Sequence, residues 1–251
     1  MASIFDIPLQ ETGGPTALAA FEYQHRVAVG ELMRLATSTE CDLIEFDSHD
    51  DILVRTKDAA GFVAEFVQVK AHASGNWTPS DLYSDENGPV PSASKSESSL
   101  VARQLSRAIG DDDAVFRVVT RFEVNHDLAV LKQPPTARDQ TAVKKLKDNL
   151  IPRFAHLTFP KDRTVGDWID KMCWRVAGPE QAVDDRNLRS IAEAVFAQFA
   201  RTLTPAQVRE IYLRLLSHAR QAALILEPRD QKGCSRTQLI MWLRECCAQL
   251  P

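Results

Sequence analysis

Three side chains between residues 51 and 70 are of the types that metal-assisted phosphodiester hydrolysis uses: Asp51, Gln68 and Lys70. Asp51 directly precedes the apolar run 52–54, and the other two belong to the apolar run 66–69 and its end. Carboxylate and amide oxygens are ligands that Mg²⁺ accepts. A lysine ammonium beside the metal can orient water or stabilise charge on the phosphate.

The two apolar runs flank a polar turn with Lys57, Asp58 and Gly61, which predicts an antiparallel hairpin. Side chains alternate between the faces of a strand, so Gln68 and Lys70 share one face. If the pairing brings Asp51 beside them, a carboxylate, a neutral oxygen and a cation converge. A hairpin with a solvated polar face would show the same pattern, so the spacing alone does not decide between the two.

A helix is predicted before the hairpin, from Ala17 to about Ala36, with Thr16 as its cap. Gln24 and Glu31 occupy one face of this helix, which either meets solvent or reaches the candidate site. The helix also carries an apolar stripe, composed of Leu18, Phe21, Ala28, Leu32 and Leu35.

The elements around the hairpin predict an α/β fold with a mixed central sheet flanked by helices. Residues 42–46 and 115–120 read as strands, and residues 98–109 as a helix. The polar segment 71–99 is long for a connection, and we expect either a functional flap or a disordered loop. Trp77 within it would either stack on a base or fasten the segment to the core, and we favour the second.

After Pro134-Pro135 the pattern becomes mostly helical, and we expect a helical C-terminal half. We therefore divide the chain into a core with the candidate site, 1–134, and a helical extension packed on it, 135–251, as one continuous domain. Residues 155–159 are expected to add an edge strand. The predicted helices of the extension are 137–150, 165–176, 186–200, 205–225 and 235–247, the fourth capped by Thr204 and the last by the capping box Ser235-Arg-Thr-Gln238.

Charge is distributed unevenly over the 251 residues, although the net charge is only −4. Residues 1–100 hold 16 Asp and Glu against 6 Lys and Arg, whereas residues 101–251 hold 18 against 24. The acidic part contains the candidate metal site, and the basic part offers phosphate contacts or a solvated surface. The five cysteines show no C-x-x-C pair, no apolar run is long enough to span a bilayer, and we expect a cytoplasmic protein without a membrane partner.

Several motifs together resemble the double-stranded DNA endonuclease domain of antiphage-defence effectors, over roughly residues 13–125. That family belongs to the restriction-endonuclease-like PD-(D/E)XK superfamily, and its members are fused to ligand-sensing domains in cyclic-oligonucleotide systems, and to NTPase or other modules in related ones. The motifs follow in the order Gly13-Gly14, Phe21-Glu-Tyr-Gln24, Glu45, Asp50-Asp51-Ile-Leu-Val and Gln68-Val-Lys70-Ala-His72.

The resemblance implies a restriction-endonuclease-like fold and assigns roles to individual residues. Asp51 would be the main metal ligand, Gln68 would replace the second acidic ligand, and Lys70 would be the catalytic lysine. A neutral amide binds a hard cation more weakly than a carboxylate, so we expect one tightly bound Mg²⁺, with Mn²⁺ as a substitute. Further candidates are Glu45 as an additional ligand, Gln24, Glu31 and His72 as supporting groups, and Arg103 and Arg107 as DNA contacts.

The function implied is metal-dependent cleavage of double-stranded DNA with low sequence selectivity. Such activity is toxic unless controlled, so we expect a homo-oligomer in the active state and a sensor, NTPase or SMC-like partner or fused domain. Two alternatives remain open at this point. The same fold could act on RNA or single-stranded DNA, or the chain could be a noncatalytic assembly module that keeps the hairpin for structure.

Overall fold

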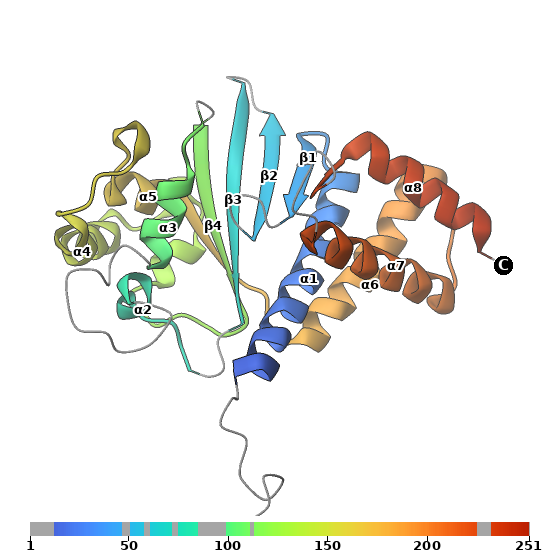
Figure 1. Ribbon diagram of the computed structural model, residues 1–251, viewed down its shortest axis with the longest axis horizontal. Helices are drawn as coiled ribbons and strands as arrows, with labels where there is room; N and C mark the ends of the chain where they lie inside the picture. Colours follow the sequence, from blue (N-terminus) through green and yellow to red (C-terminus); the bar gives the residue numbers. More distant parts are fainter. Residues whose placement is uncertain are drawn as a thin grey trace, which may run out of the picture.

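The computed structural model describes residues 13–46, 51–57, 61–71, 75–84, 99–110, 113–224 and 232–250, with side chains from residue 18 onward. Its centre is a six-stranded sheet with the order β5-β4-β3-β2-β1-β6 (Figure 1). Strands β1, β2 and β3 form an antiparallel meander, β6 pairs antiparallel with β1, and β3, β4 and β5 are parallel. The mixed sheet confirms the predicted α/β architecture. The strands are β1 Cys41–Phe46, β2 Ile52–Lys57, β3 Phe62–Lys70, β4 Asp113–Thr120, β5 Met172–Val176 and β6 Gly233–Ser235.

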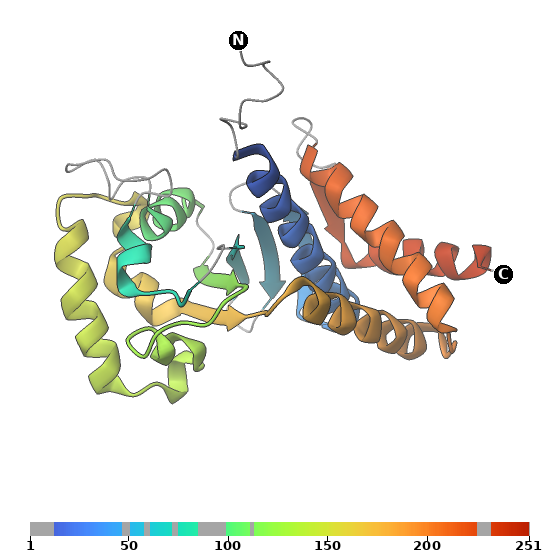
Figure 2. The same ribbon diagram turned by 90° about the horizontal axis from the view of Figure 1, so that it is seen from below.

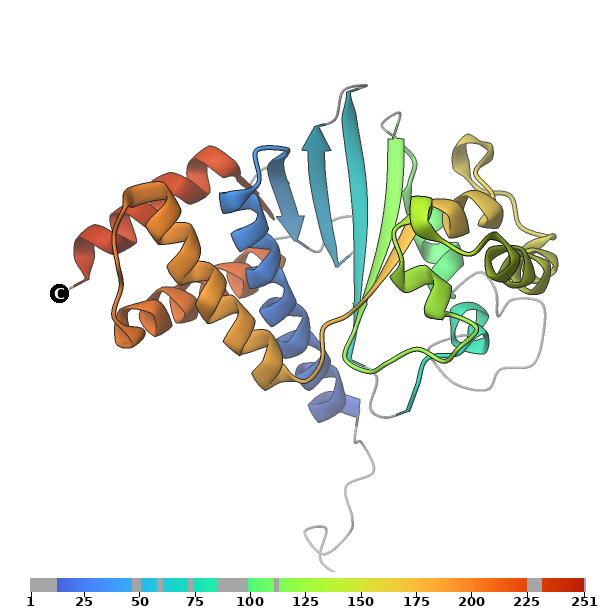
Figure 3. The ribbon, with the colours of Figure 1, turned by 180° about the vertical axis from the view of Figure 1, so that it is seen from behind.

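Helices cover the two faces of this sheet in two separate groups (Figures 2 and 3). Helices α1, α6, α7 and α8 lie on one side, and the shorter helices α2 to α5 lie on the other. The helices are α1 Gly13–Thr37, α2 Pro79–Tyr83, α3 Leu100–Arg107, α4 Gln140–Leu150, α5 Val165–Lys171, α6 Glu180–Phe199, α7 Pro205–Leu224 and α8 Arg236–Gln249. Short 3₁₀ turns cover Ala129–Lys132, Pro135–Ala137, Ile151–Phe154 and Pro160–Asp162.

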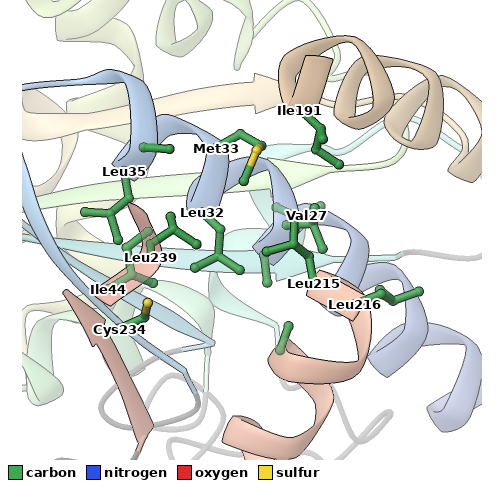
Figure 4. Close-up of a cluster of buried hydrophobic side chains, with 14 of the residues drawn as sticks. Val27, Leu32, Met33, Leu35, Ile44, Ile191, Leu215, Leu216, Cys234 and Leu239 are labelled. Carbon is green, nitrogen blue, oxygen red and sulfur yellow. The ribbon is translucent and has the colours of Figure 1, made fainter. Parts of the chain in front are cut away.

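The first core lies between α1 and its neighbouring helices and one face of β1, β2 and β3. Figure 4 shows the side chains of α1 meeting those of the strands and of the later helices. Leu32, Leu35 and Ile44 are fully buried there, and burial of each such side chain contributes about 1.5–3 kcal/mol. Helix α1 is therefore fixed on the sheet mainly by its central and C-terminal turns.

The second core lies on the opposite face and is rich in aromatic side chains. Trp168 and Trp174 are buried, and each indole N–H has a partner, Gln104 Oε1 and Thr120 Oγ1 respectively, at 2.9 Å. Trp77 is 6% exposed and its ring lies 5.6 Å from that of Trp174. Trp77 thus fastens its segment to the core, as the sequence predicted.

Helix starts follow the sequence closely in the C-terminal half. Ser235 and Gln238 form the predicted capping box of α8, and Thr204 Oγ1 accepts a hydrogen bond from the Gln207 backbone N–H at the start of α7. The predicted cap at Thr16 is wrong, because α1 already begins at Gly13. A helix cap lies outside the helical turns, and Thr16 is within them.

The apolar stripe predicted on α1 is correct only from Ala28 onward. Leu18 and Phe21 are 63% and 56% exposed, whereas Ala28, Leu32 and Leu35 are buried. Figure 1 shows that the N-terminal turns of α1 extend past the end of the sheet. These turns therefore have no strand beneath them to cover the apolar side chains.

The C-terminal half contributes two strands that the sequence analysis missed. The helix predicted over 165–176 ends at Lys171, and Met172–Val176 continues as β5 beside β4. The short β6 pairs with β1. The edge strand predicted at 155–159 is absent, since those described residues lie in turns and coil. One sheet therefore joins the two segments that the sequence analysis separated at residue 134.

Candidate active site

The register of the β2–β3 pair places the predicted residues together. Ile52 pairs with Val67 in this antiparallel ladder, so the next position sets Asp51 opposite Gln68, with Lys70 two residues further along. The Asp51 carboxylate accepts a hydrogen bond from the Val69 N–H at 2.7 Å. The hairpin pairing predicted from the sequence is confirmed, and Asp51 is held against the end of β3.

Alternation along the strands puts these side chains on one face of the sheet. Ile52 belongs to the core beneath α1, and Phe66 belongs to the aromatic core on the other face. Asp51, Gln68 and Lys70 therefore share the aromatic face. Glu45 is half-buried on β1 and pairs with Leu53, which follows Asp51 by two residues.

Helix α1 reaches this group through Gln24. Its side-chain amide donates a long hydrogen bond of 3.5 Å to the backbone carbonyl of Asp51. The contact ties the helix to the bend that precedes β2. The structure thus brings Gln24 to the candidate site, as the resemblance implied.

Gln68 has an unusual environment for a buried amide. The side chain is 2% exposed, and its Oε1 accepts no hydrogen bond from any residue that the structure describes. An unpaired buried polar atom costs about 1–3 kcal/mol. A cation or a water molecule in front of Oε1 would remove this cost, so the orphaned oxygen fits a metal ligand.

The donor set suits a hard divalent cation with few protein ligands. It offers the Asp51 carboxylate, the Gln68 amide oxygen and nearby backbone carbonyls, the kinds of oxygen that Mg²⁺ accepts together with water. Within the described part of the chain, no group of three or more His, Cys, Asp or Glu side chains could hold a metal ion. A cation held by Asp51 and Gln68 would therefore take its remaining ligands from backbone carbonyls and water.

Glu31, in contrast, lies in a separate buried ion network. Its carboxylate is 2.6 Å from Arg117, 3.1 Å from Arg34 and 3.7 Å from Arg175. Glu65 completes the network, at 2.6 Å from Arg34 and 3.1 Å from Arg117. The structure therefore does not bring Glu31 to Asp51, and three arginines occupy its carboxylate.

Electrostatics keep Glu31 ionised in this interior position. Burial on its own would raise the pKa of the Glu31 carboxyl, but the charges of Arg117 and Arg34 outweigh it and hold the pKa below its usual value. Burial would likewise lower the pKa of Arg117, and Glu31 and Glu65 raise it instead. Each charge in the network depends on its partners.

The remaining predicted residues lie apart or outside the described chain. Arg103 and Arg107 are half-buried on α3, on the aromatic side of the sheet. His72 lies outside the described residues.

Sequence reasoning missed a group of residues at the adjacent strand ends. The backbone N–H of Arg121 donates to the Lys70 carbonyl at 3.3 Å, and the Arg121 side chain pairs with Glu180 at 3.0 Å. Tyr23, the neighbour of Gln24 in sequence, donates its hydroxyl to the Gly178 carbonyl at 2.9 Å. The available signal was the position of Arg121, directly after the buried strand that ends at Thr120.

Comparison with known proteins places the chain. Residues 12–223 match the family model described as "Cap4, dsDNA endonuclease domain". No curated protein matches the chain.

Solved structures share the fold at low sequence identity. The Acinetobacter baumannii Cap4 SAVED/CARF-domain containing receptor is 11% identical with a TM-score of 0.58, covering 90% of this chain and 46% of its own. The same receptor with the cyclic trinucleotide 3'3'3'-cAAA is 10% identical with a TM-score of 0.56, covering 90% of this chain and 44% of its own. The Moraxella osloensis receptor is 12% identical with a TM-score of 0.56, covering 91% and 47%. The chain thus spans less than half the length of these receptors.

Proposed function

Since the chain belongs to the Cap4 double-stranded DNA endonuclease domain family, we propose that it hydrolyses double-stranded DNA with a divalent metal ion and with little sequence selectivity, in the cytoplasm. It would act as the effector nuclease of an antiphage defence system. The observation that carries the catalytic part is the orphaned Gln68 oxygen opposite Asp51, with Lys70 on the same face. An amide oxygen left unpaired in the interior is costly unless a ligand completes it.

Each residue has a distinct task in this proposal. Asp51 and Gln68 would hold the cation, and Glu45 would contribute a further or indirect ligand. A bound divalent cation would supply Lewis-acid activation of water and neutralisation of phosphate charge. The Val69 N–H and Gln24 orient Asp51 from two sides, the first through its carboxylate and the second through its carbonyl.

Lys70 provides the positive charge next to the reacting phosphate. Hydrolysis adds one water molecule across a P–O bond, and negative charge builds on the phosphate oxygens and the leaving oxygen. The ammonium group stabilises this charge or orients the attacking water. It lies at the end of β3, in register with Thr120 of β4, and we propose that the DNA backbone approaches from this end of the sheet.

Control of this activity is proposed to come from outside the domain. The receptors with the same fold are described as containing a SAVED/CARF domain, and one of these structures holds the cyclic trinucleotide 3'3'3'-cAAA. We propose that this chain is likewise controlled by a sensor domain or partner, and that active complexes are homo-oligomers. A net charge of −4 disfavours DNA binding by a single copy, and several copies would align basic surfaces.

The test is a plasmid-cleavage assay with Mg²⁺ over a wide range of protein concentrations, and with an added oligomerisation module. Asp51→Asn and Lys70→Met should each lower the rate by about 10² or more. The matched control is Asp42→Asn, a carboxylate on β1 that pairs with Arg55 at the surface, and it should retain full activity. Equal rates in all four proteins, or no cleavage by wild type under any of these conditions, would contradict the proposal.

Substrate class and metal are tested separately. Circular single-stranded DNA and RNA of matched length should be cut more slowly than duplex DNA, and the reverse would favour the alternative substrates. Mn²⁺ should raise the melting temperature of wild type by binding the folded state, and Asp51→Asn should remove that shift. The thermal shift reports metal binding without requiring activity.

A further inference from the structure

The ends of three parallel strands meet at one edge of the sheet, next to the candidate active site. Lys70, Thr120 and Val176 occupy equivalent positions on β3, β4 and β5. Neighbouring strands lie about 4.8 Å apart, so Lys70 and Val176 are separated by about 10 Å. Duplex DNA rises about 3.4 Å per nucleotide, so this edge spans about three nucleotides of one strand.

Three arginines gather around this edge: Arg121, Arg175 and Arg186, here called the strand-end arginines. Arg121 directly follows β4, Arg175 lies near the end of β5, and Arg186 belongs to α6. Arg175 and Arg186 line one cavity, and the charges of all three arginines act on the buried Tyr23 hydroxyl. Burial is the main cause that raises the pKa of Tyr23 to about 12. Glu180 acts in the same direction, and the three arginines act in the opposite direction.

Positive charge exceeds negative charge in this group. Glu180 pairs with Arg121 at 3.0 Å. Arg175 has only Glu31 nearby, at 3.7 Å, and that carboxylate is closer to Arg117 and Arg34. Within the described ion pairs, Arg175 therefore shares one carboxylate with two other cations.

Arg186 has a carbonyl partner rather than an acid. Its guanidinium donates to the Ala177 carbonyl. Its pKa lies below the usual value because it is partly buried and because Arg175 and Arg189 repel its charge. Such mutual repulsion between cations is relieved by a bound anion.

A cavity of about 70 Å³ opens beside these side chains. Arg175, Arg186, Asn187 and Ser190 line it, over a floor that includes Gly30 of α1. A Cβ at residue 30 would lie 3.1 Å from Asn187 Oδ1, so glycine allows α1 and α6 to approach closely here.

Contacts on the protein connect this edge to the candidate active site. Arg121 N–H binds the carbonyl of Lys70. Tyr23 binds Gly178, two residues after Val176, and its neighbour Gln24 binds Asp51. Arg175 leaves the sheet on the α1 face, where it contacts Glu31, whereas Lys70 lies on the aromatic face. A duplex that lies across the strand ends, rather than along one face of the sheet, would contact both.

We propose that Arg121, Arg175 and Arg186 bind backbone phosphates of the DNA strand on one side of the scissile phosphate. The proposal rests on the proposed nuclease function. It adds a phosphate-binding surface at the ends of β4 and β5 and the start of α6, in addition to the candidates Arg103 and Arg107 on α3. Phosphate contacts of this kind position a duplex without reading its sequence, which agrees with low selectivity.

The experiment measures duplex binding by the Asp51→Asn protein, with Mg²⁺, over a range of salt concentrations. The slope of log K against log[salt] falls by about 0.9 for each phosphate contact that is lost. Arg121→Gln, Arg175→Gln and Arg186→Gln should each reduce the slope by about this amount, and the triple variant by nearly three times as much. Arg209→Gln on the exposed surface of α7 is the control and should leave the slope unchanged.

Further measurements distinguish a lost phosphate contact from unfolding, and distinguish failure of this proposal from failure of the proposed nuclease function. Arg186→Lys keeps the charge and should stay close to the parent slope, and the melting temperature of each variant identifies any that unfolds. Unchanged slopes in the three glutamine variants would overturn the phosphate surface while leaving the nuclease proposal intact. A parent protein that does not bind duplex DNA would overturn both, and persistent cleavage by Asp51→Asn would overturn the nuclease mechanism alone.

Discussion

Strand β3 carries buried polar groups on both of its faces, and the protein satisfies them in opposite ways. On the face beneath α1, Glu65 lies in a network where each carboxylate has two or more arginine partners. On the aromatic face, three residues further along, Gln68 has an oxygen without a hydrogen bond from the described residues. The first arrangement is complete within the chain, and the second requires something from outside it.

The difference separates a structural role from a functional one. The Glu65 network joins α1 to β3 and β4 through charges that stay ionised in the interior. Removing one member of such a network leaves an uncompensated buried charge. Gln68 is neutral, so leaving its oxygen unpaired costs less, and a ligand can recover that cost.

The largest expected effect is the loss of Arg117. Arg117→Met removes the more deeply buried of the two arginines that Glu31 and Glu65 share, and the unfolding free energy should fall by about 3–5 kcal/mol. Urea denaturation with an unchanged slope m measures it. Arg55→Met, which breaks an exposed pair with Asp42, is the control and should cost about 1 kcal/mol or less. Equal losses in the two variants would mean that the buried network is no more important than a surface pair.

The next effect concerns activity rather than stability. Gln68→Leu removes the orphaned oxygen and should lower cleavage by about 10², equivalent to about 2.7 kcal/mol. Its stability should stay within about 1 kcal/mol of wild type, because no intact hydrogen bond is lost within the described chain.

Gln104 provides a matched control for that variant. It is also a buried glutamine, but its amide donates to the Phe66 carbonyl at 3.2 Å and its oxygen accepts from Trp168. Gln104→Leu should therefore destabilise the fold by about 1–3 kcal/mol while folded protein retains its activity. If the two variants behaved alike, the distinction between the two glutamines would be wrong.

The sequence was sufficient to predict the hairpin and the residues at its mouth. Side chains alternate between the two faces of β2 and β3, so the pairing that buries Ile52 and Val67 also sets Asp51 opposite Gln68. The mixed sheet followed from the order of these strands and the buried strand that became β4. These elements rely on local patterns, which a sequence displays directly.

Other features depend on contacts between residues far apart in the chain, which local sequence patterns do not reveal. Glu31 was expected to support the metal site, but its main partner, Arg117, is 86 residues away. β5 follows α5 without any intervening turn residue. The sequence therefore shows no break between the helix and the strand, and the whole segment was predicted as one helix. Gln104 makes two hydrogen bonds, whereas Gln68 Oε1 accepts none from the described residues. Because both residues are glutamines, this difference comes from tertiary packing and cannot be predicted from the residue type.

A smaller effect is expected when acid weakens the Glu31 network. The pKa of Glu31 lies below its usual 4.5 in the folded state, so the unfolded chain binds the proton first as the pH falls. The stability that Glu31 contributes is complete above about pH 4.5 and is lost as the pH drops through the folded-state pKa.

Denaturation midpoints between pH 7 and pH 2 check this expectation. Glu31→Gln cannot take up the proton, so its stability should fall less steeply below pH 4.5, by up to about 1.4 kcal/mol per pH unit. Glu123→Gln, whose carboxylate is exposed and pairs with Lys132, is the control. A wild-type slope identical to that of Glu31→Gln would show that folding does not lower the pKa of this carboxyl.

The smallest effect is expected at the outer edge of the network. Arg34 contacts both Glu31 and Glu65, but its side chain is 34% exposed, compared with 9% for Arg117. After Arg34→Met, Arg117 still neutralises both carboxylates and water can reach the vacated position, so the cost should be about 1–2 kcal/mol. Chemical denaturation of Arg34→Met, Arg117→Met and the double variant measures how strongly the two arginines are coupled. Because both neutralise the same carboxylates, the double variant should lose more stability than the sum of the single losses, whereas simple addition would show that each arginine acts alone.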